Sequence, residues 1–183
     1  QSILPTIRSR CQHIKFSALP RQILIQQLVE NGVTHSMAST VSMVTNGLEA
    51  AKTLANEEQF AQMRKTVLKL VELIRKDVHE AMFVIHEEWL PNFKEKEDME
   101  LALDLLLFAY RDITAIKANP DILTTYPDYF QTLQDIAYRT SYERLSEQMQ
   151  AILSARSSVG RNMNRTLLME QLMLKLQEGY TFV

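Results

Sequence analysis

The chain has 183 residues, of which 46% are hydrophobic and 23% charged, and its formal net charge is -2. This composition is typical of a globular protein, and it excludes a disordered chain and a chain that binds polyanions through its overall charge. No apolar run reaches the ~18 residues of a membrane-spanning helix. The single cysteine cannot form an internal disulfide and no secretory signal is visible, so we expect a cytoplasmic protein.

Residues 1–17 differ from the rest of the chain. Polar residues alternate with Cys11, Ile14 and Phe16, a pattern weakly typical of a short strand. A lone strand has no neighbour to pair with. We therefore expect this segment to be the tail of a preceding domain.

Three short helices are predicted for residues 18–56. Pro20 suits a first helical turn, and the pairs Asn31-Gly32 and Asn46-Gly47 separate the apolar-periodic stretches. The whole chain has only four glycines and five prolines, which favours helices over many short strands. The sequence therefore predicts a small three-helix domain, too small to be very stable alone.

A larger helical block is predicted for residues 57–183. Asn56 is expected to cap its first helix with Gln59 in a capping box, and Asp77 to cap a helix that runs to Trp89. The charged run KEKEDME then forms a solvated connection. The chain as a whole is predicted to be all-α, in two blocks.

The second half of this block is predicted as one very apolar helix followed by two more. Asn119-Pro120 ends the apolar helix, and residues 119–130 are predicted to be a loop with aromatic anchors. Helices are then expected at about 132–158, with a break near Thr140, and at about 163–178.

Motifs for chemistry are missing from the sequence. The four glycines are too dispersed for a phosphate loop, and His79 and His86 are seven residues apart, which is not the HExxH spacing of a zinc site. Cys11 has no paired base, so a small packed residue is the simpler interpretation. We therefore expect no metal, no cofactor and no active site within this chain.

The string ILPTIRSRCQ at residues 3–12 resembles the Ser-Arg-Cys motif of the clamp-loader branch of AAA+ ATPases. In that family the motif lies near the end of the nucleotide-fold domain, and a three-helix lid and a helical collar follow. Residues 103–117 and 161–176 resemble the central and last collar helices of the bacterial delta-prime family of DNA polymerase III subunits. The resemblance implies an AAA+ tail at 1–17, a lid at 18–56 and a collar at 57–183.

The resemblance implies a role for Arg10 as an arginine finger that reaches the ATP of a neighbouring subunit. A guanidinium is permanently charged and presents a planar fork to phosphate oxygens, so it can stabilise charge that develops on a γ-phosphate. ATP would be bound by the neighbours and not by this chain. The spacing alone also allows Arg8 and Arg10 to form surface ion pairs.

The resemblance also distinguishes among clamp-loader subunits. ATP-hydrolysing members carry an arginine three residues after a glycine in the third lid helix. Here the glycine is Gly47, and Ala50 stands at the position of that arginine. This departure implies a non-catalytic subunit of the delta-prime type. The alternatives are a tau/gamma ATPase subunit and, in a different class, a stand-alone helical adaptor or regulator.

The implied partners are tau/gamma and delta subunits in a hetero-pentamer, which would load the sliding clamp on primer-template DNA during replication. Arg156, Arg161 and Arg165 form a basic cluster, for which acidic residues of a partner are favoured over DNA phosphate. Apolar residues of the last two helices spread over more than one face, so some are expected at an oligomer interface and the rest in the core. The interface candidates are Leu153, Met163, Leu167, Leu168, Met169, Leu172 and Met173.

Overall fold

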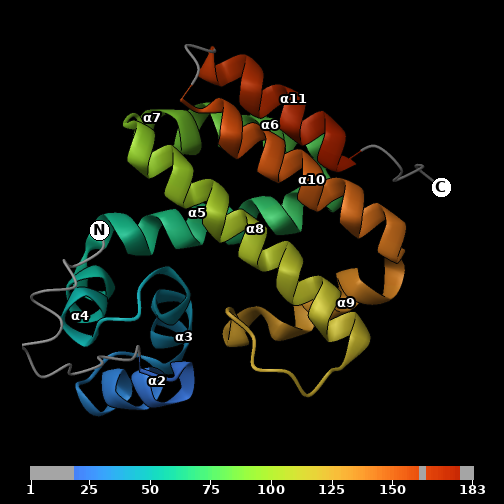
Figure 1. Ribbon diagram of the computed structural model, residues 1–183. Helices are drawn as coiled ribbons and strands as arrows, with labels where there is room; N and C mark the ends of the chain where they lie inside the picture. The colour runs from blue at the N-terminus through green and yellow to red at the C-terminus, as the bar shows by residue number, and fades with distance from the viewer. Residues whose placement is uncertain (1–18, 161–163, 178–183) are drawn as a thin grey trace, which may run out of the picture.

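The computed structural model describes residues 19–160 and 164–177, and all regular structure within these ranges is helical (Figure 1). The predicted all-α fold is confirmed. None of the described helices combines the length and the apolar character that crossing a membrane would require. In chain order the elements are α2 (Arg21–Glu30), α3 (His35–Val44), α4 (Leu48–Asn56), α5 (Glu58–Lys76), α6 (Val78–Val84), η1 (Ile85–Trp89), α7 (Leu90–Asn92), α8 (Lys96–Ala118), η2 (Pro127–Tyr129), α9 (Phe130–Arg139), α10 (Tyr142–Ser158) and α11 (Arg165–Gln177).

Helices α2, α3 and α4 pack on one another at one end of the molecule and form a three-helix unit (Figure 1). Gly32 has a φ of 88°, a left-handed conformation that glycine adopts readily, and it turns the chain after α2. Thr34 then caps α3 by accepting a hydrogen bond from the backbone N–H of Met37 at 3.4 Å. Leu28 and Val41 are fully buried between the helices.

The other helices form a bundle around α8, which packs against α5, α9 and α10 (Figure 1). Fully buried side chains occur on α8 from Met99 to Ile116, at spacings that cover about half of the helix surface. Helix α11 closes the bundle against α10, α6 and α5. The buried side chains of the three-helix unit and the bundle form one continuous core. The domain ranges 18–56 and 57–183 stay predictions.

The predicted break near Thr140 is confirmed. Helix α9 ends at Arg139, and Thr140 bends away while its hydroxyl donates to the backbone oxygen of Ile136 at 2.8 Å. Ser141 then caps α10 by accepting from the backbone N–H of Arg144 at 3.2 Å. This change of direction allows both helices to contact α8.

The helix that begins at Val78 contains a wider turn that periodicity did not predict. After α6 the chain continues as the π-helix η1 up to Trp89. Trp89 is fully buried; its indole N–H donates to the sulfur of Met99 at 3.0 Å, and its ring meets Phe93 edge-on at 5.2 Å. A π-type turn accommodates an extra residue within a helix. It keeps both Ile85 and Trp89 in the core.

The predicted capping residue of α5 is wrong, whereas the predicted cap of α6 is confirmed. Asn56 is the last residue of α4, and its side chain donates to the backbone oxygen of Lys52 at 3.0 Å. Glu57 takes the capping position of α5 without a side-chain hydrogen bond. The Asp77 carboxylate accepts hydrogen bonds from the backbone N–H groups of His79 at 2.9 Å and Glu80 at 3.1 Å, both in the first turn of α6.

We expect Asp77→Ala to lower the free energy of unfolding by about 1 kcal/mol, because two backbone donors of α6 lose their acceptor. Glu57→Ala is the matched control, since Glu57 occupies the same position without a capping bond, and its effect should be within about 0.5 kcal/mol. Urea unfolding measures both values. Equal losses for the two variants would contradict the prediction.

Candidate functional site: a polar clasp and an exposed helical surface

Several residues singled out from the sequence lie outside the described residues. These are Arg8, Arg10 and Cys11 near the start, and Arg161 and Met163 between α10 and α11. The arginine finger at Arg10 therefore stays a prediction. Within 19–160 and 164–177, no three His, Cys, Asp or Glu side chains are grouped as a metal ion would require.

A buried carboxylate organises the loop between α8 and η2. Asp112 on α8 is 1% exposed. It accepts hydrogen bonds from the backbone N–H of Thr125, from the Thr125 hydroxyl at 3.0 Å and from the backbone N–H of Tyr126 at 3.3 Å. Arg111 completes the set with a contact of 2.9 Å. Asp112 thus has the several donors that a buried charge requires.

Tyr126 fixes the same loop at a second point on α8. Its side chain is fully buried, and its hydroxyl donates to the backbone oxygen of Leu105 at 2.7 Å. Burial raises the pKa of Tyr126, so the phenol stays neutral and remains a donor. The guanidinium of Arg64 lies 5.4 Å from the centre of the ring.

Arg21, the first residue of α2, joins the three-helix unit to this loop. Its guanidinium donates to the backbone oxygens of Leu123 at 3.1 Å and Thr124 at 3.0 Å. It also donates to the backbone oxygen of Ser39 at 3.2 Å and to the hydroxyl of Ser42 at 3.1 Å. Burial, followed by repulsion from nearby Arg111, lowers the pKa of Arg21. All three guanidinium nitrogens are engaged.

Thr40 on α3 adds a second connection. Its buried hydroxyl lies 3.1 Å from the backbone oxygen of Thr125 and accepts from the Nε of Arg64 at 2.9 Å. Arg64, on α5, also forms an ion pair with Asp128. We call Arg21, Thr40, Arg64, Asp112 and the loop 123–128 the polar clasp. The clasp connects α2, α3, α5 and α8 independently of the covalent link between α4 and α5.

The interface candidates divide into buried and exposed residues. Leu153 on α10 is 43% exposed and Leu167 on α11 is 48% exposed. Leu174, 52% exposed, was not among the candidates, although it lies two helical turns after Leu167 and on the same side. The following candidates pack into the core: Leu168, Met169, Leu172 and Met173.

Arg156, from the predicted basic cluster, is neutralised within the chain. Its guanidinium makes a two-point contact with the carboxylate of Asp104 on α8. Hydrogen bonding to that carboxylate raises the pKa of Arg156. Arg161 lies outside the described residues. Arg165 forms no ion pair with a carboxylate among the residues that the structure describes.

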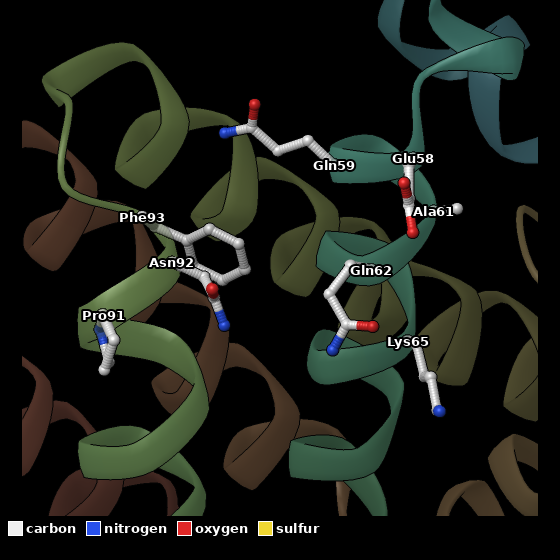
Figure 2. Close-up of a pocket in the computed structure, with 8 residues that line it drawn as sticks. All are labelled: Glu58, Gln59, Ala61, Gln62, Lys65, Pro91, Asn92 and Phe93. Atoms are coloured by element: carbon white, nitrogen blue, oxygen red, sulfur yellow. The ribbon is translucent and has the colours of Figure 1, made fainter.

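A surface hollow of about 560 Å³ lies between α5 and the segment 91–93 (Figure 2). Figure 2 shows Gln59, Gln62 and Lys65 on the α5 side and Phe93 opposite them. The amide of Gln59 donates to Asp98 at 3.0 Å, and that of Gln62 lies 3.4 Å from the Thr66 hydroxyl. The amide donors of Gln59 and Gln62 are therefore already used within the chain.

Comparison with known proteins relates the chain to replication proteins. Residues 58–178 match the family described as DNA polymerase III, delta subunit, C terminal. The chain is also 36% identical over 179 residues to the DNA polymerase III subunit delta' of Bacillus subtilis strain 168. That alignment covers 98% of this chain and 54% of the relative, so the chain spans about half the relative's length.

We expect Asp112→Ala to lower the free energy of unfolding by about 3 kcal/mol, because the buried donors of Thr125 and Tyr126 lose their acceptor and Arg111 loses its ion-pair partner. Asp104→Ala provides a matched control on the same helix. Its carboxylate binds Arg156 at the surface, so the loss should stay within about 1 kcal/mol. Chemical denaturation of both variants measures the difference, and a similar loss for the two would refute the importance of the buried carboxylate.

Arg21→Met should accelerate amide hydrogen exchange in α2 and α3 about tenfold or more, because charged hydrogen bonds to the loop are lost. Exchange in α10 should not change. Arg75→Met removes a surface guanidinium that makes one long hydrogen bond of 3.5 Å to the backbone oxygen of Asp135, and it controls for the loss of charge. Equal acceleration in α10 would argue against a local clasp.

Proposed function

The chain belongs to the family of C-terminal domains of DNA polymerase III delta subunits, and from this membership we propose that it forms the lid and collar of a delta-prime-type clamp loader component. The observation that carries the proposal is the 36% identity to a delta' subunit along 98% of the chain. This alignment extends beyond the family match at 58–178, so it includes the three-helix unit as well as the bundle.

In this proposal α2 to α4 are the lid, and α5 to α11 are the collar. The polar clasp supports a positioning role, because it attaches the lid to the collar helices α5 and α8 through side chains of both. The lid and collar then move together.

The collar is proposed to assemble with tau/gamma and delta subunits into a hetero-pentamer, which acts on the sliding clamp and primer-template DNA. Exposed leucines on α10 and α11 support a role in protein contacts, because large apolar side chains at a surface favour association. Ala50 supports a non-catalytic role. It lies exposed in the first turn of α4, where the resemblance places an arginine in the ATP-hydrolysing subunits.

Arg10 is proposed to act in trans on the ATP of a neighbouring subunit. It precedes the clasp residue Arg21 in the chain, so the segment that carries it leads directly into the part of the lid that the clasp fixes. Positioning matters because an arginine finger must reach the transferred phosphoryl group with the correct geometry.

The test uses the full-length protein mixed with tau/gamma and delta subunits, sliding clamp and primer-template DNA. Arg10→Ala should lower the DNA-dependent ATPase rate at least about tenfold, since a finger contributes roughly 10³ or more at the site it serves. Arg10→Lys should fail to restore the rate, because an ammonium lacks the planar fork. Native mass spectrometry should show the same pentamer for wild type and variants.

Two outcomes would contradict different parts of this proposal. An unchanged ATPase rate in Arg10→Ala would remove the finger assignment while leaving the collar role intact. Failure of the wild-type protein to enter any complex with tau/gamma and delta subunits would remove the clamp-loader assignment itself.

A further inference from the structure

Phe83 on α6 is an exposed aromatic side chain between two free carboxylates. It is 61% exposed, although α6 buries Ala81 and Val84 on its other side. Glu80 lies three residues before it and Glu87 four residues after it, so both are about one helical turn away. Both glutamates are exposed, and neither has an ion-pair partner among the residues that the structure describes.

The neighbouring helix α11 extends this surface with two leucines. Leu167 and Leu174 are 48% and 52% exposed and lie two turns apart. Glu170 lies one turn from each of them, and its carboxylate contacts Nε2 of His86 at 3.1 Å. His86 is in turn three residues after Phe83. His86 lies in η1, directly after α6, so this contact joins the exposed side of that segment to α11.

We group these exposed residues as the α6/α11 surface: Phe83 and Glu80 of α6, Glu87 of the adjoining η1, and Leu167 and Leu174 of α11. Helices α6 and α11 pack against each other in the bundle (Figure 1). Each already contributes buried side chains to the core from its inward side. The exposed apolar side chains on these two helices therefore do not belong to the internal core, and they are available for contact with another protein.

The charges near this surface are arranged for a cationic partner. On α11, Lys175 lines a groove toward α10 together with Ala151 and Ser154. A guanidinium or ammonium placed over the Phe83 ring would gain a cation–π contact. It would also reach Glu80 or Glu87 for a charge-assisted hydrogen bond. An acidic partner would meet like charges and be disfavoured.

We propose that the α6/α11 surface binds an amphipathic helix of a neighbouring subunit, which packs apolar side chains on Leu167 and Leu174 and places an arginine or lysine against Phe83. Such a helix presents its anchors at one-turn spacings, which match the two-turn separation of the leucines. The inference rests on the proposed assembly, and it specifies the surface used and the chemistry of the partner.

The first test measures binding of the full-length protein to tau/gamma and delta subunits by surface plasmon resonance. The double variant Leu167→Ser/Leu174→Ser should bind about thirtyfold more weakly, because apolar anchors of an interface are lost. Ile122→Ser is the matched control, since Ile122 is 42% exposed in the loop after α8 and lies outside this surface. Its affinity should change less than about threefold. Leu153→Ser tests the rival surface on α10.

The second test addresses charge without altering packing. Glu80→Lys/Glu87→Lys should weaken binding about tenfold at low salt, and the effect should shrink at high salt because surface charges are screened. Glu95→Lys/Glu97→Lys, which reverses two exposed carboxylates at the start of α8, is the control for the same change of net charge. Circular dichroism should give the same melting curve for each variant as for wild type.

The outcomes separate this inference from the proposed function. If the wild type binds and the α6/α11 variants bind equally well, the α6/α11 surface is not the binding site, and the clamp-loader role remains. If Leu153→Ser alone weakens binding, the contact belongs to α10 and the inference is overturned. If charge reversal strengthens binding, the partner is acidic, which also overturns it. If wild type binds neither tau/gamma nor delta, both the proposed function and the inference fail.

Discussion

The fold depends on the need of one buried carboxylate for hydrogen-bond donors. Asp112 lies in the C-terminal half of the central helix, where solvent does not reach it. The loop after α8 supplies backbone and side-chain donors to it, so the loop takes one path across the helix. The backbone oxygens of Leu123 and Thr124 on this path accept hydrogen bonds from Arg21. The attachment of the three-helix unit thus begins at Asp112.

The polar clasp and the shared core act together. The core supplies non-directional stabilisation between the two blocks, whereas the hydrogen bonds of Arg21 and Thr40 restrict their relative orientation. Each hydrogen bond adds only about 1 kcal/mol net, or more where a charge takes part. Because several share the same loop, they open together or stay closed together. In the proposed clamp-loader role, this coupling makes lid and collar one mechanical unit.

Helices α8 and α11 show how one bundle can combine internal and external roles. Helix α8 directs its polar groups to intrachain partners: Asp112 binds the loop and Asp104 binds Arg156. Helix α11 buries one side in the bundle and leaves Leu167 and Leu174 in solvent. The proposed protein contacts therefore lie on the outer helices, while the central helix holds the molecule together.

Periodicity and capping residues in the sequence determined the helices, because these signals act within a few residues; Asp77 and the break at Thr140 are examples. The sequence alone also carried the family resemblance at 103–117. It could not show that Arg21 bonds to Thr124, 103 residues away, or that Leu168 is buried while Leu167 is exposed. The π-helix η1 was missed for a similar reason, since its wider turn follows the packing of Trp89. Only the tertiary structure decided these features, because distant partners meet through packing and no local pattern encodes the pairing.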